Sequence, residues 1–204
     1  EITLMAVTKT FPAEAIEEAW AAGIREFGEN YVQEFEGKHA RVRALDGARV
    51  HLIGHLQSNK SRRAVELFDS IDTVDSVKLA RRLAEGAVAA GPLDVFVEVK
   101  LSEEASKAGV APEDLPAVIE AVRALPALRL RGLMTVPPWS DDAEQARPYF
   151  RRLAALAREH GIEGLNMGMS HDFEVAIEEG ATVIRVGTAL FGRRPRKTAA
   201  NPAQ

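Results

Sequence analysis

Short apolar segments alternate with longer amphipathic segments along the whole chain. Apolar segments with the length and composition of buried β-strands occur at 4–9, 26–30, 50–54, 70–74, 94–101, 128–136, 165–168 and 182–187. Segments with a helical period of apolar positions follow them at 13–22, 32–45, 60–68, 77–89, 115–124, 143–160 and 173–179, and residues 189–192 have room for a short helix at most. This alternation predicts an α/β domain built on a parallel sheet.

The number of β units decides between the two common α/β architectures. Eight units without a break in their order favour a single (β/α)8 TIM barrel over an open doubly wound sheet. The chain has 204 residues, fewer than the ~250 of a typical barrel, so its loops must be short. We expect the barrel to occupy residues 1–192, and residues 193–204, which are basic and then rich in Ala and Pro, to form a disordered tail.

Composition narrows the function classes. The net charge of −4 argues against general electrostatic attraction to nucleic acid or to anionic membranes. No apolar run approaches the ~18 residues of a transmembrane helix, and the first residues lack the layout of a signal peptide. The absence of cysteine excludes disulfides, thiolate catalysis and cysteine-based zinc sites. We therefore expect a cytoplasmic protein with no nucleic-acid or membrane partner.

The first candidate for chemistry is Lys9, at the end of the first apolar segment and on the same strand face as Met5 and Val7. In a closed barrel the eighth strand lies beside the first, and Arg185 interrupts its β-branched residues. Two inward cations at one barrel mouth would lower the pKa of the lysine, which makes it a Schiff-base nucleophile. The alternatives are a Lys9 that extends into solvent and an Arg185 that pairs with an inward carboxylate such as Glu98.

Two loops have the character of a phosphate site. Gly187 and Thr188 follow the eighth strand, where barrels often bind phosphate, and Ser170 lies in the glycine-containing loop after the seventh strand. His51 and His55 are four positions apart on one strand, hence about 13 Å apart, and cannot share a metal ion. The sequence therefore predicts an anion site and no metal site.

Seven segments together resemble a known family. AVTKTFPAEAI, FGENYVQE, HLIGHLQSNK, SKAGV, LRGLMTVPP, GMSHDFEVAIEEGAT and IRVGTALFG occur in this order through residues 3–192. They are similar to the YggS/PROSC family of pyridoxal 5′-phosphate (PLP) homeostasis proteins, whose barrel resembles the fold-type III barrel of alanine racemase. The sequence departs from many relatives at His171, where an acidic residue is common, and at Phe11, where a lysine is frequent. Relatives also usually begin with a helix before the first strand.

The resemblance implies PLP as the cofactor and assigns contacts but no catalytic residue. The implied contacts are Lys9 as the Schiff-base lysine, Asn30 beside the cofactor, Ser170, Gly187 and Thr188 at the phosphate, Arg185 at the pyridine nitrogen, and Met134 and His51 along the pocket wall.

Three functions are compatible with these sequence features. The resemblance favours a monomeric PLP carrier for intracellular PLP homeostasis and delivery to apo PLP-dependent enzymes, with little or no turnover. A PLP-dependent amino-acid racemase would need a second base, which in alanine racemase is a tyrosine supplied across a dimer by a second domain; the tyrosines here are Tyr31 and Tyr149. A barrel that binds a sugar phosphate without PLP would leave Lys9 opposite Arg185 unexplained.

Overall fold

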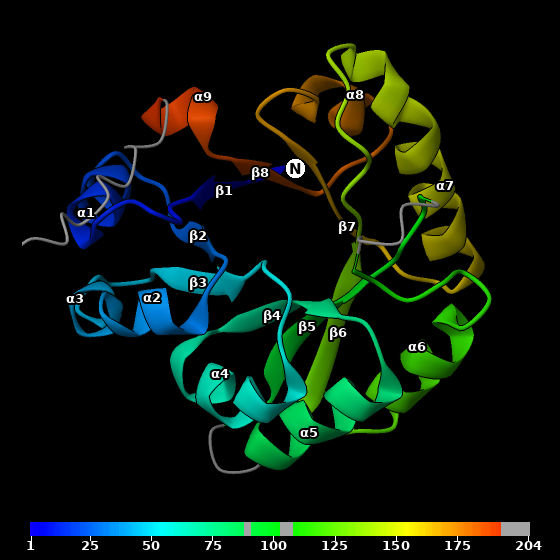
Figure 1. Cartoon of the computed structure of the whole chain (residues 1–204), viewed down its shortest axis with the longest axis horizontal. Helices are drawn as coiled ribbons and strands as arrows, with labels where there is room; N and C mark the ends of the chain where they lie inside the picture. Colours follow the sequence, from blue (N-terminus) through cyan, green and yellow to red (C-terminus); the bar gives the residue numbers. More distant parts are fainter. Residues whose placement is uncertain (88–90, 103–107, 193–204) are drawn as a thin grey trace, which may run out of the picture.

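The computed structural model describes residues 1–87, 91–102 and 108–192, which form one closed parallel barrel with helices around it (Figure 1). Each strand pairs with the next, and β1 closes the barrel on β8, with Met5 opposite Arg185. The strands are β1 Thr3–Val7, β2 Glu26–Glu29, β3 Arg49–Leu52, β4 Ser70–Val74, β5 Leu93–Glu98, β6 Leu128–Met134, β7 Gly164–Met169 and β8 Val183–Val186. The closed order confirms the predicted TIM barrel and excludes the open doubly wound sheet.

Helices follow the strands and cover the outside of the barrel (Figure 1). They are α1 Ala13–Ala21, α2 Val32–Glu36, α3 His39–Arg43, the 3₁₀ helix η1 Ser58–Lys60, α4 Ser61–Leu67, α5 Val77–Ala87, α6 Leu115–Arg123, the 3₁₀ helix η2 Ala143–Ala146, α7 Arg147–Glu159, α8 Phe173–Glu178 and the short α9 Thr188–Phe191. The core lies between strands and helices, because the longer helices turn an apolar stripe inward. In α5 that stripe is Leu79, Ala80, Leu83, Ala84 and Ala87.

The helix predicted over 32–45 is wrong, because the structure has two short helices there. α2 ends at Glu36, and Gly37 with Lys38 forms the joint to α3. The N–H of Lys38 donates to the carbonyl three residues back, on Phe35, which tightens the turn. Glycine also has low helix propensity. Lys38 is buried at this joint, although the helical pattern does not distinguish it from an exposed lysine.

The predicted first strand extends too far, because β1 ends at Val7 and Lys9 lies in the turn that follows. The N–H of Phe11 donates to the carbonyl of Thr8 over 3.1 Å and closes this turn. β5 and β6 likewise end before the predicted limits. The predicted tail at 193–204 lies outside the described residues. No helix within the described ranges is long and apolar enough to cross a membrane.

Candidate functional site

The main cavity lies at the C-terminal ends of the strands, where β7, β8 and β1 meet. It has a volume of about 570 Å³. Its described lining brings together five of the predicted cofactor contacts, namely Lys9, Ser170, Arg185, Gly187 and Thr188. The closed barrel produces this grouping, because it places the first strand of the chain beside the last.

One corner of the cavity is built from hydrogen-bond donors that suit an anion. The backbone N–H groups of Gly187 and Ala189 converge on the Ser170 hydroxyl oxygen, at 3.1 and 3.3 Å. Gly168, near the end of β7, lets this strand come close to α8, because its φ is 92° and an added Cβ would lie 2.5 Å from Ala176 Cβ. Backbone N–H groups beside a hydroxyl are the donors that bind phosphate oxygens, so the residues present fit a phosphate group.

Arg185 forms the floor of the cavity and is fixed by oxygen acceptors. Its Nη1 donates to the carbonyl and the side-chain oxygen of Asn166, and its Nη2 donates to the carbonyl of Thr135 over 3.0 Å. Burial lowers the pKa of Arg185, and the negative charges of Glu98 and Asp72 oppose this effect. Nearby carboxylates therefore stabilise the inward cation while its side chain lines the cavity.

A polar network continues below Arg185 through the barrel interior. Asn166 donates to Asp72 over 2.8 Å, and His51 lies between Asp72, at 2.9 Å, and Glu26, at 2.6 Å. Burial alone would lower the pKa of His51, but the charges and hydrogen bonds of the two carboxylates outweigh it and raise the pKa to about 10. His51 is therefore a buried cation at neutral pH.

Three predicted contacts lie outside the lining of the main cavity. Asn30 lines a neighbouring pocket of about 240 Å³, and its Oδ1 is buried without a hydrogen-bond partner in the described structure. His51 lies in the network below Arg185, and Met134 is buried at the end of β6. Their contacts to a cofactor stay predictions.

The structure also adds residues that were not among the predicted cofactor contacts. Trp139 and His171 form the rim of the main cavity, with ring centroids 4.9 Å apart, and Trp139 is 71% exposed. In the sequence, the position of the tryptophan after Pro137 and Pro138, in the loop beyond the sixth strand, could have indicated that it lies at the barrel mouth. Asn166 and Asp72 were signalled by their position as polar residues inside apolar strands.

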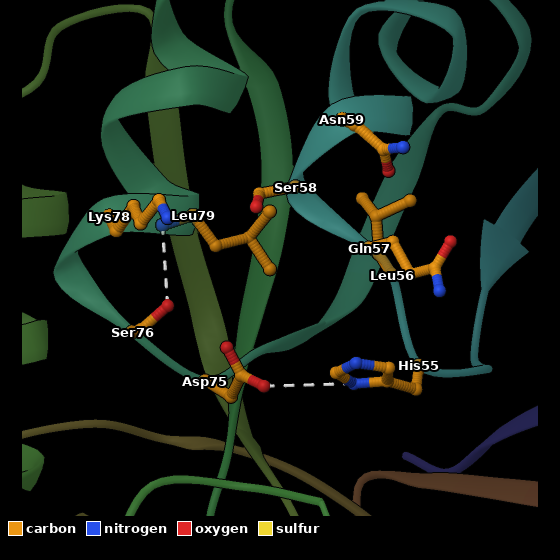
Figure 2. A pocket seen from close by; sticks show the side chains of 9 residues that line it. All are labelled: His55, Leu56, Gln57, Ser58, Asn59, Asp75, Ser76, Lys78 and Leu79. Carbon is orange, nitrogen blue, oxygen red and sulfur yellow. Dashed lines mark hydrogen bonds and ion pairs between the residues drawn. The ribbon is translucent and has the colours of Figure 1, made fainter.

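Figure 2 shows a second pocket of about 420 Å³ between the loop after β3 and the start of α5. His55 Nδ1 and Asp75 Oδ2 lie 3.7 Å apart across it, and Ser76 accepts a hydrogen bond from the backbone N–H of Leu79. Its other polar side chains include Lys78, which is exposed. None of the residues predicted to contact PLP lines this pocket. Within the described ranges, no group of His, Asp or Glu side chains is arranged to hold a metal ion.

Known proteins share both the sequence and the fold. The family model "Alanine racemase, N-terminal domain" matches residues 1–195. A pyridoxal phosphate homeostasis protein of Pseudomonas aeruginosa is 52% identical over 196 residues, covering 95% of this chain and 85% of that protein. Its counterpart in Escherichia coli is 46% identical over 202 residues, covering 95% and 86%.

Solved structures show the same relationship as the related sequences. PipY of Synechococcus elongatus, in a structure with PLP bound, is 43% identical with a TM-score of 0.85 and covers 94% of this chain and 92% of its own. Alanine racemase of Clostridium difficile is 16% identical with a TM-score of 0.75, covering 96% of this chain and 53% of its own, which shows the shared fold. This protein belongs to the alanine racemase N-terminal domain family, among the pyridoxal phosphate homeostasis proteins.

Proposed function

We propose that this protein binds PLP as a Schiff base on Lys9 and serves PLP homeostasis and delivery, with little or no turnover. The observation that carries the proposal is a single cavity that Lys9, Arg185 and the donors around Ser170 line together. The relative PipY, with PLP bound in its structure, supports the choice of cofactor. When bound, PLP supplies an aldehyde that a lysine amine attacks reversibly, with loss of one water.

Different residues of the cavity would bind different parts of the cofactor. Ser170 and the N–H groups of Gly187 and Ala189 would bind the phosphate, together with Thr188. Arg185 would face the pyridine nitrogen. An arginine has donors and no acceptor, so in this position it would hold that nitrogen unprotonated.

Borohydride reduction followed by peptide mass spectrometry tests the proposal. Reduction makes the lysine–PLP bond permanent, so the expected result is one modified peptide with the added mass on Lys9. A modification on another lysine, or none after incubation with PLP, contradicts it. Absence of visible absorbance after that incubation would instead favour a barrel that binds a sugar phosphate.

We expect no amino-acid racemisation at ordinary enzyme rates. Arg185, placed at the pyridine nitrogen, would weaken the electron withdrawal that proton removal from an amino acid requires. No tyrosine lines the main cavity in the part of the chain that the structure describes, so a second base of the racemase type is missing from that lining. Chiral chromatography of alanine and other amino acids after incubation with the PLP-loaded protein is the measurement. Turnover of about 1–1000 per second would show a racemase instead.

We also propose that the protein is a monomer in the cytoplasm and that apo PLP-dependent enzymes receive its PLP. The proposed contacts Lys9, Ser170, Arg185, Gly187 and Thr188 all line one cavity of this chain. The net charge of −4 adds a modest self-repulsion. Multi-angle light scattering at low protein concentration should return the mass of one chain, and a dimer mass would contradict this prediction.

A further inference from the structure

Lys9 occupies the second position of a strained β-turn. The turn runs from Thr8 to Phe11 and is closed by the 3.1 Å hydrogen bond from Phe11 N–H to the Thr8 carbonyl. Its third residue, Thr10, has a φ of 69°, the one positive φ of a non-glycine residue in the described ranges. A turn of this kind favours glycine at that position, and a β-branched residue is strained there. Such a conformation persists only where surrounding contacts hold it.

Lys38 supplies the centre of those contacts. Its ammonium group donates to Glu29 Oε1 at 2.9 Å and to Glu34 Oε1 at 2.9 Å, from the joint between α2 and α3. The side chain of Lys38 is 9% exposed and that of Glu29 is 0% exposed. We refer to Lys38, Glu29 and Glu34 as the clamp.

The clamp grips the chain on both sides of Lys9. On one side, the Thr8 hydroxyl donates to Glu29 at 2.7 Å, and the Lys38 ammonium donates to the Thr8 carbonyl at 3.1 Å. On the other side, the backbone N–H of Thr10 donates to Glu34. Both neighbours of Lys9 are therefore fixed to one buried cation and its two carboxylates.

The charges make the clamp depend on Lys38. Burial raises the pKa of the Glu29 carboxyl, and the charge of Lys38 opposes that rise. Glu29 Oε2 is buried without a hydrogen-bond partner in the described structure. Without Lys38, Glu29 and Glu34 would face each other without a counterion, and the hydrogen bond to the Thr8 carbonyl would be lost.

We propose that the clamp is a positioning device for Lys9, holding the strained turn so that the Lys9 amine stays directed into the cavity that Arg185 and Ser170 line. This inference rests on the proposed function, because it assigns the clamp a role in forming the bond between Lys9 and PLP.

Lys38→Met is the first test. It removes the ammonium group and keeps an unbranched apolar stem. We expect PLP to bind about 10- to 100-fold more weakly, by analogy with residues that orient the side chains that bind a metal ion. Borohydride trapping of Lys9 should slow, and the pH midpoint of the visible band of lysine-bound PLP should shift. The PLP affinity, the trapping rate and the pH midpoint are measured at a temperature where circular dichroism shows the variant folded.

Two further variants separate positioning from general stability. Thr10→Gly in the Lys38→Met background removes the strain, and should recover much of the lost PLP affinity. Arg147→Met is the matched control, because Arg147 contacts Glu144, Glu178 and Glu179 at 2.6 Å each and does not line the main cavity. It should lower thermal stability and leave the PLP readouts unchanged.

Glu34→Ala covers the case in which Lys38→Met does not fold. The Glu34 side chain is 27% exposed, so its removal deletes the acceptor for Thr10 N–H and leaves Lys38 paired with Glu29. We expect the same changes in PLP affinity and trapping rate, smaller in size. If wild type carries PLP on Lys9 and the folded clamp variants bind it unchanged, the clamp inference fails alone. The same holds if Thr10→Gly restores nothing. If wild type carries no PLP on Lys9, the proposed function fails first.

Discussion

Protein in which alanine replaces Lys9 will lose the visible absorbance of lysine-bound PLP and remain folded. Lys9 is the one lysine among the described residues that line the main cavity. It lies in a turn at the barrel mouth, outside β1, so truncating its side chain removes no strand pairing. The phosphate corner stays intact, and the variant should bind PLP weakly and release it on dialysis. Absorbance after dialysis and thermal melting by circular dichroism measure the two outcomes.

Lys78→Ala is the matched control, because Lys78 lines the pocket of Figure 2 and is exposed at the same end of the barrel. It should keep the full absorbance band and the full borohydride adduct. A Lys9→Ala protein with an unchanged band would show that another lysine carries the cofactor. Loss of the band in Lys78→Ala would place the cofactor in the second pocket.

The barrel was predictable because buried parallel strands appear in a sequence as short, nearly continuous apolar runs. Leu93–Glu98 is an example, with Leu93 and Val95–Val97 apolar and every side chain of the strand buried. Eight such units imply closure, and closure alone brings Lys9 and Arg185, which lie far apart in the sequence, to one cavity. The main grouping of the candidate site therefore followed from counting strands and reading their C-terminal ends.

The clamp could not be predicted in the same way. A lysine in an amphipathic segment is typical of a solvated helix surface, and Lys38 has no local feature that distinguishes it. Its partners lie on another strand and in another turn, at Glu29 and Thr8, so only the folded chain brings the three together. The helix break at Gly37 was missed for the same reason. It accompanies the buried contacts of Lys38, which form only in the folded chain.

The polar interior shows a different limit. Asp72 and Asn166 are visible in the sequence as polar residues inside apolar strands, which indicates buried polar groups but does not name their partners. Asn30 and Met134 were assigned from the resemblance at strand ends, and His51 was assigned from it within the third strand. The position of a residue at a strand end places it along the barrel axis, but it does not determine which pocket the side chain enters. The structure places these three side chains outside the main cavity's lining.

His51→Gln should destabilise the protein strongly near pH 6 and much less near pH 10. His51 is 7% exposed and lies between Asp72, which is fully buried, and Glu26. Removing one member of a buried ion pair typically lowers the free energy of unfolding by about 3–5 kcal/mol, because the remaining charge is left uncompensated. Glutamine keeps a similar length and a hydrogen-bond donor, so the loss of the cation is the main change.

The direction of the pH dependence follows from the pKa of His51, which is raised from 6.5 to about 10 on folding. A group with a raised pKa binds its proton more tightly in the folded state, so its stabilisation is fully present below the unfolded pKa. That stabilisation is lost as the pH rises from 6.5 through 10, where folded wild type gives up the proton. The difference in unfolding free energy between wild type and His51→Gln should therefore shrink across this window. No cysteine titrates there, since the chain has none.

Urea denaturation in steps of about one pH unit between the two limits measures this difference, with the slope against urea checked for constancy. His55→Gln is the matched control, because His55 also pairs with an aspartate, Asp75, but its side chain is 57% exposed. An exposed pair contributes about 0–1 kcal/mol, so His55→Gln should change the unfolding free energy little at any pH. A His51→Gln difference that stays constant from pH 6 to pH 10 would mean that His51 is neutral in the folded protein. In that case Asp72 would rely on the charge of Arg185, and Glu26 would rely on Arg49, whose Nε lies 3.6 Å from Glu26 Oε1.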